Sequence, residues 1–119
     1  MSVSLMVVDD NEDLLFLLSR QLQLEGFRVT TCRHGKNFLA QLLKEMPDVV
    51  LLDISMGSVT GIELCEMVRK NKKTRSIRIL LMSGNIDISE MAQSSGADGY
   101  ITKPIDIAEI KKKIALVME

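Results

Sequence analysis

Four short apolar runs in this chain each end directly before a side chain that can take part in phosphate chemistry. Runs this short are typical of strands buried on both faces, as in a parallel sheet with helices on either side. Ligands of such open sheets bind at the carboxyl ends of the strands. If the runs lie side by side, three carboxylates, a hydroxyl and an ammonium meet at one edge of the sheet. The runs and the residues that follow them are 5–8 with Asp9 and Asp10, 49–52 with Asp53, 79–82 with Ser83, and 99–102 with Lys103.

The segments between these runs have the three-and-four spacing of amphipathic helices. The pattern predicts helices at 12–25, 36–46, 60–71, 88–95 and 106–117, and a weaker, alternating strand at 28–32. Thr60 and Glu63 form a capping-box pattern at the start of the third helix. The fourth helix is short and polar. The side chains expected to face the core are Leu39, Leu42, Leu43 and Met46 in the second helix, and Met91 and Ala92 in the fourth.

Strands that alternate with helices predict a parallel sheet with right-handed crossovers. Five such units fit an α/β fold, a three-layer α/β/α sandwich with the flavodoxin-like strand order 2-1-3-4-5. In that order the first and third strands are neighbours, so Asp9 and Asp10 lie next to Asp53. The length of 119 residues suits one domain. We therefore expect a single domain over residues 1–119, without a linker or a second unit.

The three carboxylates can be explained one by one or as a group. Acids before a helix can cap it, and an acid after a strand can be a turn residue. Like charges about 4 Å apart, however, repel by roughly 4 kcal/mol per pair at an effective dielectric near 20. A cluster of three therefore either takes up a proton or binds a cation. Oxygen ligands without His or Cys favour a hard ion, and Mg²⁺ suits a sparse site that keeps several waters.

Lys103 and Ser83 add the other groups that a bound phosphoryl group requires. Taken singly, Lys103 could be a surface lysine, and Ser83 could satisfy a backbone group at the strand end. Facing an acidic metal site, the ammonium and the metal neutralise phosphoryl oxygens while the hydroxyl donates a hydrogen bond. A carboxylate can itself be the nucleophile and form an aspartyl phosphate.

In this order, and over the whole length of the chain, these residues resemble the motifs of the receiver domain of two-component response regulators. Asp9 and Asp10 match the acidic pair of that family. The resemblance implies that Asp10 is a direct Mg²⁺ ligand, that Asp9 acts through water, and that the carbonyl of Ser55 is a main-chain ligand. It implies that Asp53 is the phosphoryl acceptor, close to the metal.

The resemblance extends to the end of the fourth strand and to the segment 96–104. Ser83 matches the switch Ser/Thr of the family, and Tyr100 matches the aromatic residue that changes rotamer on activation. Lys103 and Pro104 match the family's lysine and proline, which are joined there by a cis peptide. The resemblance therefore implies that Ser83 and Lys103 contact the phosphoryl group.

The function implied by this resemblance is a phosphorylation-dependent signalling switch. Phosphate would pass to Asp53 from the phosphohistidine of a histidine kinase or phosphotransfer protein, with Mg²⁺. The fourth helix, fifth strand and fifth helix would form the switching face, which docks a downstream effector protein or a fused output domain. The domain would not be a conventional enzyme, although it would catalyse its own phosphorylation and the hydrolysis of its own aspartyl phosphate. Formation of a weak homodimer is left open.

The composition limits the other partners. The net charge of −1 gives no large field that would recruit nucleic acid or an anionic membrane. No apolar stretch approaches the roughly 20 residues that cross a bilayer. Cys32 and Cys65 are far apart and lack metal-site spacing, so we expect reduced thiols in a cytoplasmic protein.

Three other functions fit parts of the pattern. An FMN-binding electron carrier would need a hydroxyl-rich phosphate loop where this chain has the acidic segment 9–13. A phosphatase that forms an aspartyl phosphate would need a second acid at Ser55 and a cap domain. A degenerate receiver that acts only as a binding surface would not keep all five site residues.

One departure from the family pattern is Gly57 after Met56, where the family often has proline, and it puts the rigidity of that loop in question.

Overall fold

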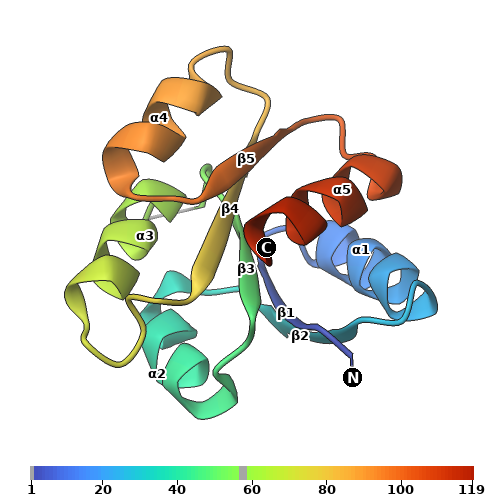
Figure 1. The fold of residues 1–119 in the computed structure, drawn as a ribbon, viewed down its shortest axis with the longest axis horizontal. Coiled ribbons are helices and arrows are strands. Elements are labelled where there is room, and N and C mark those ends of the chain that lie inside the picture. The colour runs from blue at the N-terminus through green and yellow to red at the C-terminus, as the bar shows by residue number, and fades with distance from the viewer. Residues whose placement is uncertain (1, 57–58) are drawn as a thin grey trace.

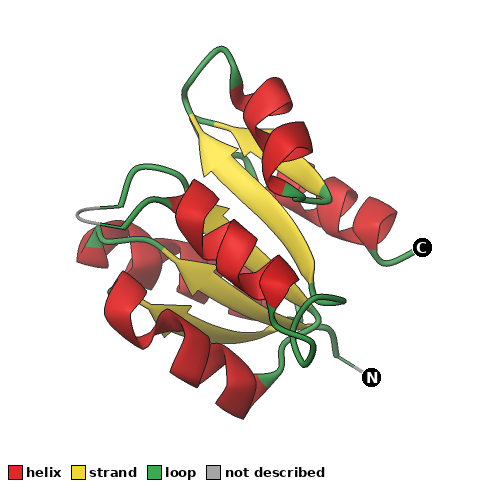
Figure 2. Ribbon diagram, turned by 90° about the vertical axis from the view of Figure 1, so that its left-hand side faces the viewer, coloured by secondary structure: helices red, strands yellow, loops and turns green. Residues whose placement is uncertain are grey.

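The computed structural model describes residues 2–56 and 59–119, which form a sheet between two layers of helices (Figure 2). All strand pairs are parallel, and the arrowheads in Figure 2 point toward the same end of the molecule. The order is β2-β1-β3-β4-β5, so the predicted flavodoxin-like order is confirmed. The strands are β1 (Ser4–Val8), β2 (Arg28–Cys32), β3 (Val49–Asp53), β4 (Arg78–Ser83) and β5 (Gly99–Thr102).

In the described residues, four helices connect the strands and a fifth follows β5, all within one or two residues of the predicted bounds. They are α1 (Glu12–Leu24), α2 (Gly35–Glu45), α3 (Gly61–Lys70), α4 (Ile88–Ser95) and α5 (Ile107–Val117). Helices α1 and α5 cover one face of the sheet, and α2, α3 and α4 cover the other (Figure 1). The capping box of Thr60 and Glu63 is present at the start of α3. Within the described ranges, no helix has the length and hydropathy needed to cross a membrane.

The central strands are buried on both faces, as the aliphatic runs predict. Alternate side chains point to opposite faces of a strand, and so each run supplies two hydrophobic cores. On β1, Met6 and Val8 pack beneath α2, α3 and α4, whereas Leu5 and Val7 pack beneath α1 and α5. This two-sided burial fixes the strand positions and therefore fixes which residues emerge at the carboxyl edge.

The expected inner face of α2 was partly wrong. Phe38 and Leu42, one helical turn apart, are fully buried, whereas Leu43 is 37% exposed and Met46 is 47% exposed. Adjacent helical residues point about 100° apart, so a face centred on Leu42 turns Leu43 toward solvent. Met46 leaves the helix in a left-handed conformation with φ of 43°, which carries its side chain away from the sheet.

The core side of α4 also differs from the expectation. Ala92 is buried as predicted, but Met91 is only half-buried, and Ile88 and Ser95 take the other core positions. These three buried residues follow the helical spacing of four and three. Ser95 can be buried because its hydroxyl donates a hydrogen bond to the Ala92 carbonyl oxygen at 3.3 Å.

Candidate functional site

Three carboxylates meet where β1 and β3 end, because these strands are direct neighbours in the sheet. Val8 pairs with Leu52 across the ladder, which leaves the following acids side by side. One carboxylate oxygen each from Asp9, Asp10 and Asp53 lies within 4.8 Å of the other two. Asp9 and Asp53 are only 2% exposed, whereas Asp10 is open to solvent. The predicted convergence of the acidic pair with Asp53 is therefore present in the structure.

Asp9 is the most constrained of these acids. Its Oδ1 accepts a hydrogen bond from the Asn11 backbone N–H at 3.0 Å. Its Oδ2 is buried and receives no hydrogen bond from the described residues. Burial raises the pKa of the Asp9 carboxyl, and the nearby charges of Asp53 and Asp10 raise it further, against the Asn11 N–H and the Lys103 ammonium, which lower it. A buried carboxylate oxygen without a partner is a group that a cation would stabilise.

The donor set fits a divalent cation that binds oxygen. A buried Asp9 oxygen that accepts no hydrogen bond from the described residues, next to two further carboxylates, would gain from a hard ion such as Mg²⁺. Such a site is sparse, since one of its three acids is exposed and open to water. Ser55 lies in the exposed loop after β3, and its carbonyl stays a predicted ligand. Gly57, the departure in this loop, lies outside the described residues.

Asp53 is held in place by the close approach of the α3 start to the end of β3. The Gly61 N–H donates a hydrogen bond to the Ile54 carbonyl oxygen at 3.0 Å, and the Ile54 N–H donates to Met82 at 3.1 Å. A Cβ atom at Gly61 would collide with the backbone carbonyl oxygen of Asp53. Gly61 therefore lets the helix start lie directly against the acidic residue. The capping-box pattern located this helix start, but no sequence signal indicated the contact with Asp53.

Lys103 connects the carboxylates to the ends of β4 and β5. Its Nζ lies 2.9 Å from Asp53 Oδ1 and 3.9 Å from Asp9 Oδ2. Its backbone N–H donates to the Ser83 carbonyl oxygen at 2.9 Å. The peptide bond to Pro104 is cis, as the family resemblance implied. One ammonium thus neutralises part of the charge of two buried carboxylates.

Ser83 ends β4 at the same edge of the sheet and is 6% exposed. Its Oγ accepts a hydrogen bond from the Asn85 backbone N–H at 2.9 Å. The hydroxyl proton stays available for an acceptor, because this bond uses only a lone pair. Asp53 pairs with Met82, the residue before Ser83, and the Lys103 N–H binds the Ser83 carbonyl oxygen, so Ser83 ends its strand at the same edge as the carboxylate cluster. The sequence did not indicate Asn85, which links Ser83 to the loop before α4.

Tyr100 lies on β5, away from the carboxylates. It is partly buried and packs against the core beneath α2, α3 and α4. The Lys113 ammonium of α5 lies 4.8 Å from the centroid of its ring, within the range of a cation–π contact. The structure thus places Tyr100 between α4 and α5, at the predicted switching face and apart from the carboxylate cluster.

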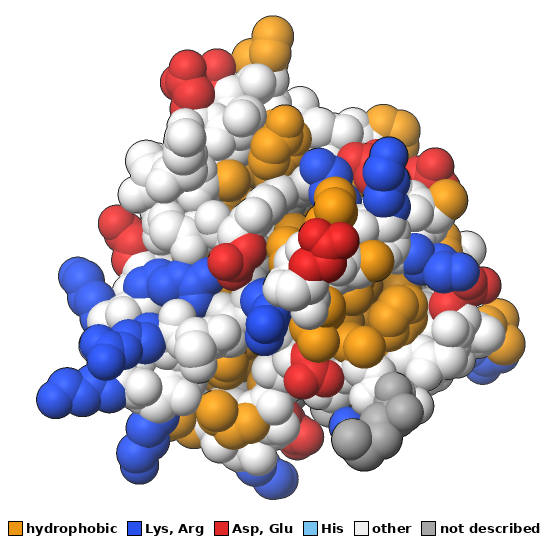
Figure 3. Space-filling view, in the orientation of Figure 1, with side chains coloured by type: hydrophobic (Ala, Val, Ile, Leu, Met, Phe, Trp, Pro, Cys, Tyr) orange, Lys and Arg blue, Asp and Glu red, His pale blue; other side chains and the backbone are white. Residues whose placement is uncertain are grey.

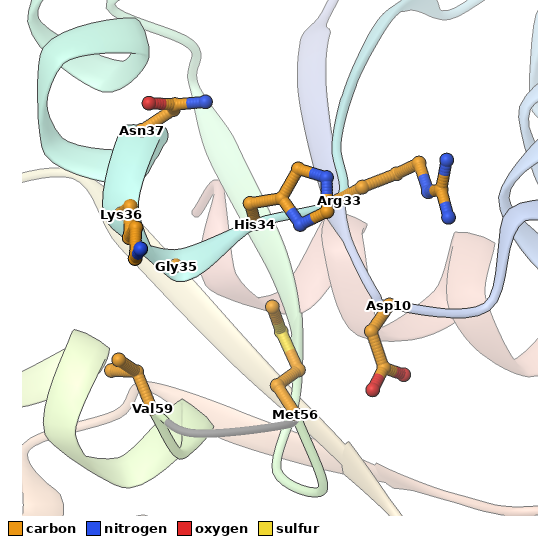
Figure 4. A pocket seen from close by; sticks show the side chains of 8 residues that line it. All are labelled: Asp10, Arg33, His34, Gly35, Lys36, Asn37, Met56 and Val59. Atoms are coloured by element: carbon orange, nitrogen blue, oxygen red, sulfur yellow. The ribbon is translucent and has the colours of Figure 1, made fainter.

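A cleft of about 530 Å³ adjoins the site at Asp10 (Figure 4). Arg33 and His34 of the β2–α2 turn and Lys36 of α2 lie on one side, and Met56 and Val59 lie on the other. Arg33 pairs with the exposed Glu12 at 3.3 Å. The cleft leaves the exposed carboxylate of Asp10 accessible from the solvent.

Known proteins share this fold and sequence pattern. A family model described as "Response regulator receiver domain" matches residues 5–115. The "Phosphate regulon transcriptional regulatory protein PhoB" of Rhizobium meliloti is 32% identical over 114 residues, which cover 94% of this chain and 50% of that protein. The "Alkaline phosphatase synthesis transcriptional regulatory protein PhoP" of Bacillus subtilis is 30% identical, with 99% of this chain and 49% of that protein covered. The chain spans about half the length of these curated relatives.

Solved structures give the same result over nearly the full length. The chemotaxis protein CheY4 of Vibrio cholerae is similar with a TM-score of 0.89 and 26% identity, covering 98% of this chain and 99% of that one. A putative response regulator from Chloroflexus aurantiacus has a TM-score of 0.92 and 26% identity, covering 99% and 98%.

Proposed function

Because the chain belongs to the response regulator receiver family of two-component signalling, in which phosphorylation is the switch, we propose that its acceptor is Asp53. The observation that carries this assignment is the pairing of a buried Asp53 carboxylate with the Lys103 ammonium at 2.9 Å, beside Asp9, whose Oδ2 accepts no hydrogen bond from the described residues. Family membership excludes the FMN carrier and the cap-domain phosphatase. A degenerate receiver is disfavoured by the convergence of the acids with Lys103 and Ser83.

The transfer starts from a phosphohistidine of a histidine kinase or phosphotransfer protein. An Asp53 carboxylate oxygen attacks the phosphorus, a new P–O bond forms, and the P–N bond to the donor imidazole breaks with its electron pair on nitrogen. The Lys103 ammonium and the Ser83 hydroxyl donate to phosphoryl oxygens as charge moves onto them. Water later attacks the phosphorus, the P–O bond to Asp53 breaks with its electron pair on the carboxylate oxygen, and phosphate leaves. The domain thus catalyses its own phosphorylation and dephosphorylation without being a conventional enzyme.

The site is proposed to require Mg²⁺. The proposed ligands are the carboxylates of Asp10 and Asp53 and the carbonyl of Ser55, with Asp9 acting through water. When bound, the ion supplies positive charge that offsets repulsion between the incoming phosphoryl oxygens and the acids. Asp9 is suited to hold a bound water, because its buried Oδ2 accepts no hydrogen bond from the described residues.

Signal output is proposed to run through Ser83 and Tyr100 to the face formed by α4, β5 and α5. The Ser83 hydroxyl moves toward the phosphoryl group and takes Asn85 with it, since the two are hydrogen bonded at 2.9 Å. That movement opens space beside the partly buried Tyr100. The face then docks a downstream effector protein or a fused output domain, and a weak homodimer is a further use of it.

The 119 residues are proposed to act as a single receiver domain. Relatives of about twice this length are named transcriptional regulatory proteins, and that activity is a property of those proteins. For this chain we propose no direct contact with nucleic acid or with a membrane, because its charges nearly balance.

A phosphotransfer profile tests the proposal. Candidate histidine kinases are first phosphorylated with labelled ATP and then mixed with the wild type, Asp53→Asn, or Asp13→Asn as a matched control on the exposed start of α1. We expect one kinase to label the wild type and Asp13→Asn rapidly with Mg²⁺ and to leave Asp53→Asn unlabelled. Equal labelling of all three proteins would contradict the assignment of Asp53.

A further inference from the structure

Basic side chains gather on the α3 side of the molecule (Figure 3). Segment 69–78 contains six basic residues and no acidic residue. Lys70, Lys72, Lys73 and Arg75 are exposed, as expected for solvated charges. Arg69 differs, because only 22% of its side chain is exposed and its guanidinium is directed at the turn between α4 and β5.

Arg69 joins three segments with four hydrogen bonds. Its Nε donates to the Gly96 carbonyl oxygen at 2.7 Å, and its Nη1 donates to the carbonyl oxygens of Arg75 and Ile77 at 2.8 and 2.6 Å. Its Nη2 binds Asp98 Oδ2 at 2.7 Å. A planar guanidinium presents these donors in a fixed geometry that a lysine lacks. The side chain therefore fixes the α4–β5 turn to α3 and to the loop before β4.

Asp98 and Gly96 complete this connection. Asp98 Oδ2 also accepts the Ile79 N–H at 2.7 Å, and the Asp98 N–H donates to the Ile79 carbonyl oxygen at 2.8 Å. Gly96 ends α4 with φ of 86°, and a Cβ atom there would lie 3.2 Å from Arg69 Cγ. One helical turn earlier along α3, the buried Cys65 Sγ donates to the Ser95 carbonyl oxygen at 3.4 Å. The carboxyl end of α4 is thus held from two positions on α3.

The amino end of α4 is held differently. Residues 84–87 are all exposed, and Ile86 is 93% exposed. This loop connects to the phosphorylation site through the bond from the Asn85 N–H to Ser83 Oγ. Segments with few buried contacts open at low free energy. The first residue of α4, Ile88, is buried in the core, so the weakly held segment is the loop 84–87 before the helix, whereas the turn after the helix is bonded to α3.

We propose that Arg69 is a positioning residue of the switch, which anchors the carboxyl end of α4 so that phosphorylation pivots the helix about that end. This inference rests on the proposed function, because it requires a phosphoryl group on Asp53 to act on Ser83. Arg69 touches no reacting atom. Its role is to turn a small shift of the loop at 84–87 into a rotation of α4 instead of a displacement of the whole helix with its turn.

Spin-label distances measure the two ends of α4 separately. A reference label at Ala40→Cys on the exposed side of α2 is paired with Ser89→Cys near the amino end or with Ser94→Cys near the carboxyl end. All three positions are exposed. Beryllofluoride with Mg²⁺ serves as the phosphoryl mimic. Each pair is measured in the wild-type background, in Arg69→Met, and in Lys70→Met, a control that removes a neighbouring exposed cation.

In the wild type and in Lys70→Met, we expect the mimic to shift the Ser89 distance by about 2 Å and to leave the Ser94 distance unchanged. In Arg69→Met, both distances should shift. Arg69→Lys keeps a cation beside Asp98 with fewer donors, so the Ser94 shift should be intermediate. Equal shifts of the two distances in the wild type, or an unchanged Ser94 distance in Arg69→Met, would overturn the inference.

The wild-type measurement alone remains decisive if Arg69→Met fails to fold. Amide shifts at Asp53 and Ser83, recorded on the same samples, separate this inference from the proposed function. Shifts at both residues with equal movement of the two helix ends overturn only the pivot. No shift at either residue in the wild type overturns the proposed function, and the pivot with it.

Discussion

Lys103 Nζ lies 2.9 Å from Asp53 Oδ1, which joins the loop after β5 to the end of β3 across 50 residues of sequence. The same ammonium lies 3.9 Å from Asp9 Oδ2. Three carboxylates and one ammonium leave the cluster with net negative charge when all are ionised. The residual charge suits a divalent cation, and we expect the Lys103 ammonium to contact phosphoryl oxygens when Asp53 is phosphorylated.

Removing the ammonium should weaken both the fold and the reaction. We expect Lys103→Met to lower the free energy of unfolding without Mg²⁺ by about 1 to 3 kcal/mol, because buried carboxylates lose a charged hydrogen bond. Adding Mg²⁺ should recover part of this loss. Urea denaturation with and without Mg²⁺ measures the effect, with Lys112→Met on the exposed side of α5 as the control. A loss of the same size in the control would contradict this explanation.

The raised pKa of Asp9 predicts an unusual pH dependence. Burial is the largest cause of the shift, from an ordinary value of 3.8. The folded protein therefore holds this proton more tightly than the unfolded chain. That contribution to stability is fully present below the unfolded value and is lost as the pH rises through the folded value. The ionised Asp9 is accordingly destabilising at neutral pH when no cation is bound.

Asp9→Asn isolates this effect, since the amide can still accept the Asn11 N–H. In EDTA, we expect the variant to be more stable than the wild type at pH 7, and the difference to shrink as the pH falls toward 4. Mg²⁺ should stabilise the wild type more than the variant. Urea midpoints across this pH range measure the difference. A difference that does not change with pH would contradict the account.

Gly61 should be required for the position of Asp53. Because a Cβ atom there collides with the Asp53 carbonyl oxygen, Gly61→Ala should lower stability by about 1 to 3 kcal/mol and slow phosphorylation. Gly84→Ala is the matched control, since its Cβ would meet Lys103 Cβ at an ordinary 3.8 Å. Thermal unfolding and labelling by acetyl phosphate measure both variants. Normal labelling of Gly61→Ala would show that the close approach does not matter.

Ser83 should respond to a phosphoryl group on Asp53 and should not itself be phosphorylated. Ser83→Ala removes the hydroxyl and its bond from Asn85, so Asp53 should still be labelled while the loop before α4 fails to move. Ser83→Thr keeps the hydroxyl and should respond as the wild type does. Amide shifts of residues 84–91 with beryllofluoride and Mg²⁺ test the coupling. Wild-type shifts in the alanine variant would remove Ser83 from the switch.

The strand order and the meeting of the acids could be predicted because both follow from local patterns. The aliphatic run 49–52 of β3 predicts burial on both faces without knowledge of the strands beside it, and the run is buried in the structure. The acid that follows the run must then lie at the carboxyl edge of the sheet. The helix faces were harder to predict. Phe38 and Leu43 both fit an amphipathic helix, and only packing against the sheet decides that Phe38 is buried and Leu43 is not.

Three details of the contacts between distant segments had no sequence signal. The lack of space at Gly61 depends on how α3 meets β3. That Asp9 Oδ2 accepts no hydrogen bond from the described residues depends on which donors the loops bring near it. The four bonds of Arg69 require the turn at Gly96 and the start of β4 to lie together. In the sequence, Arg69 is one of six nearby basic residues, and nothing there distinguishes it.

The most direct test of the central claim is the location of a phosphoryl group on the intact chain. The wild type is incubated with acetyl phosphate and Mg²⁺, and mass spectrometry measures the mass of the protein and then of its peptides. We predict one added phosphate, stable in acid and labile in base, on the peptide that contains Asp53. The label should disappear with EDTA, with Asp10→Ala and with Asp53→Asn. Full labelling of Asp53→Asn, or labelling of the wild type that is unchanged by EDTA, would contradict the account.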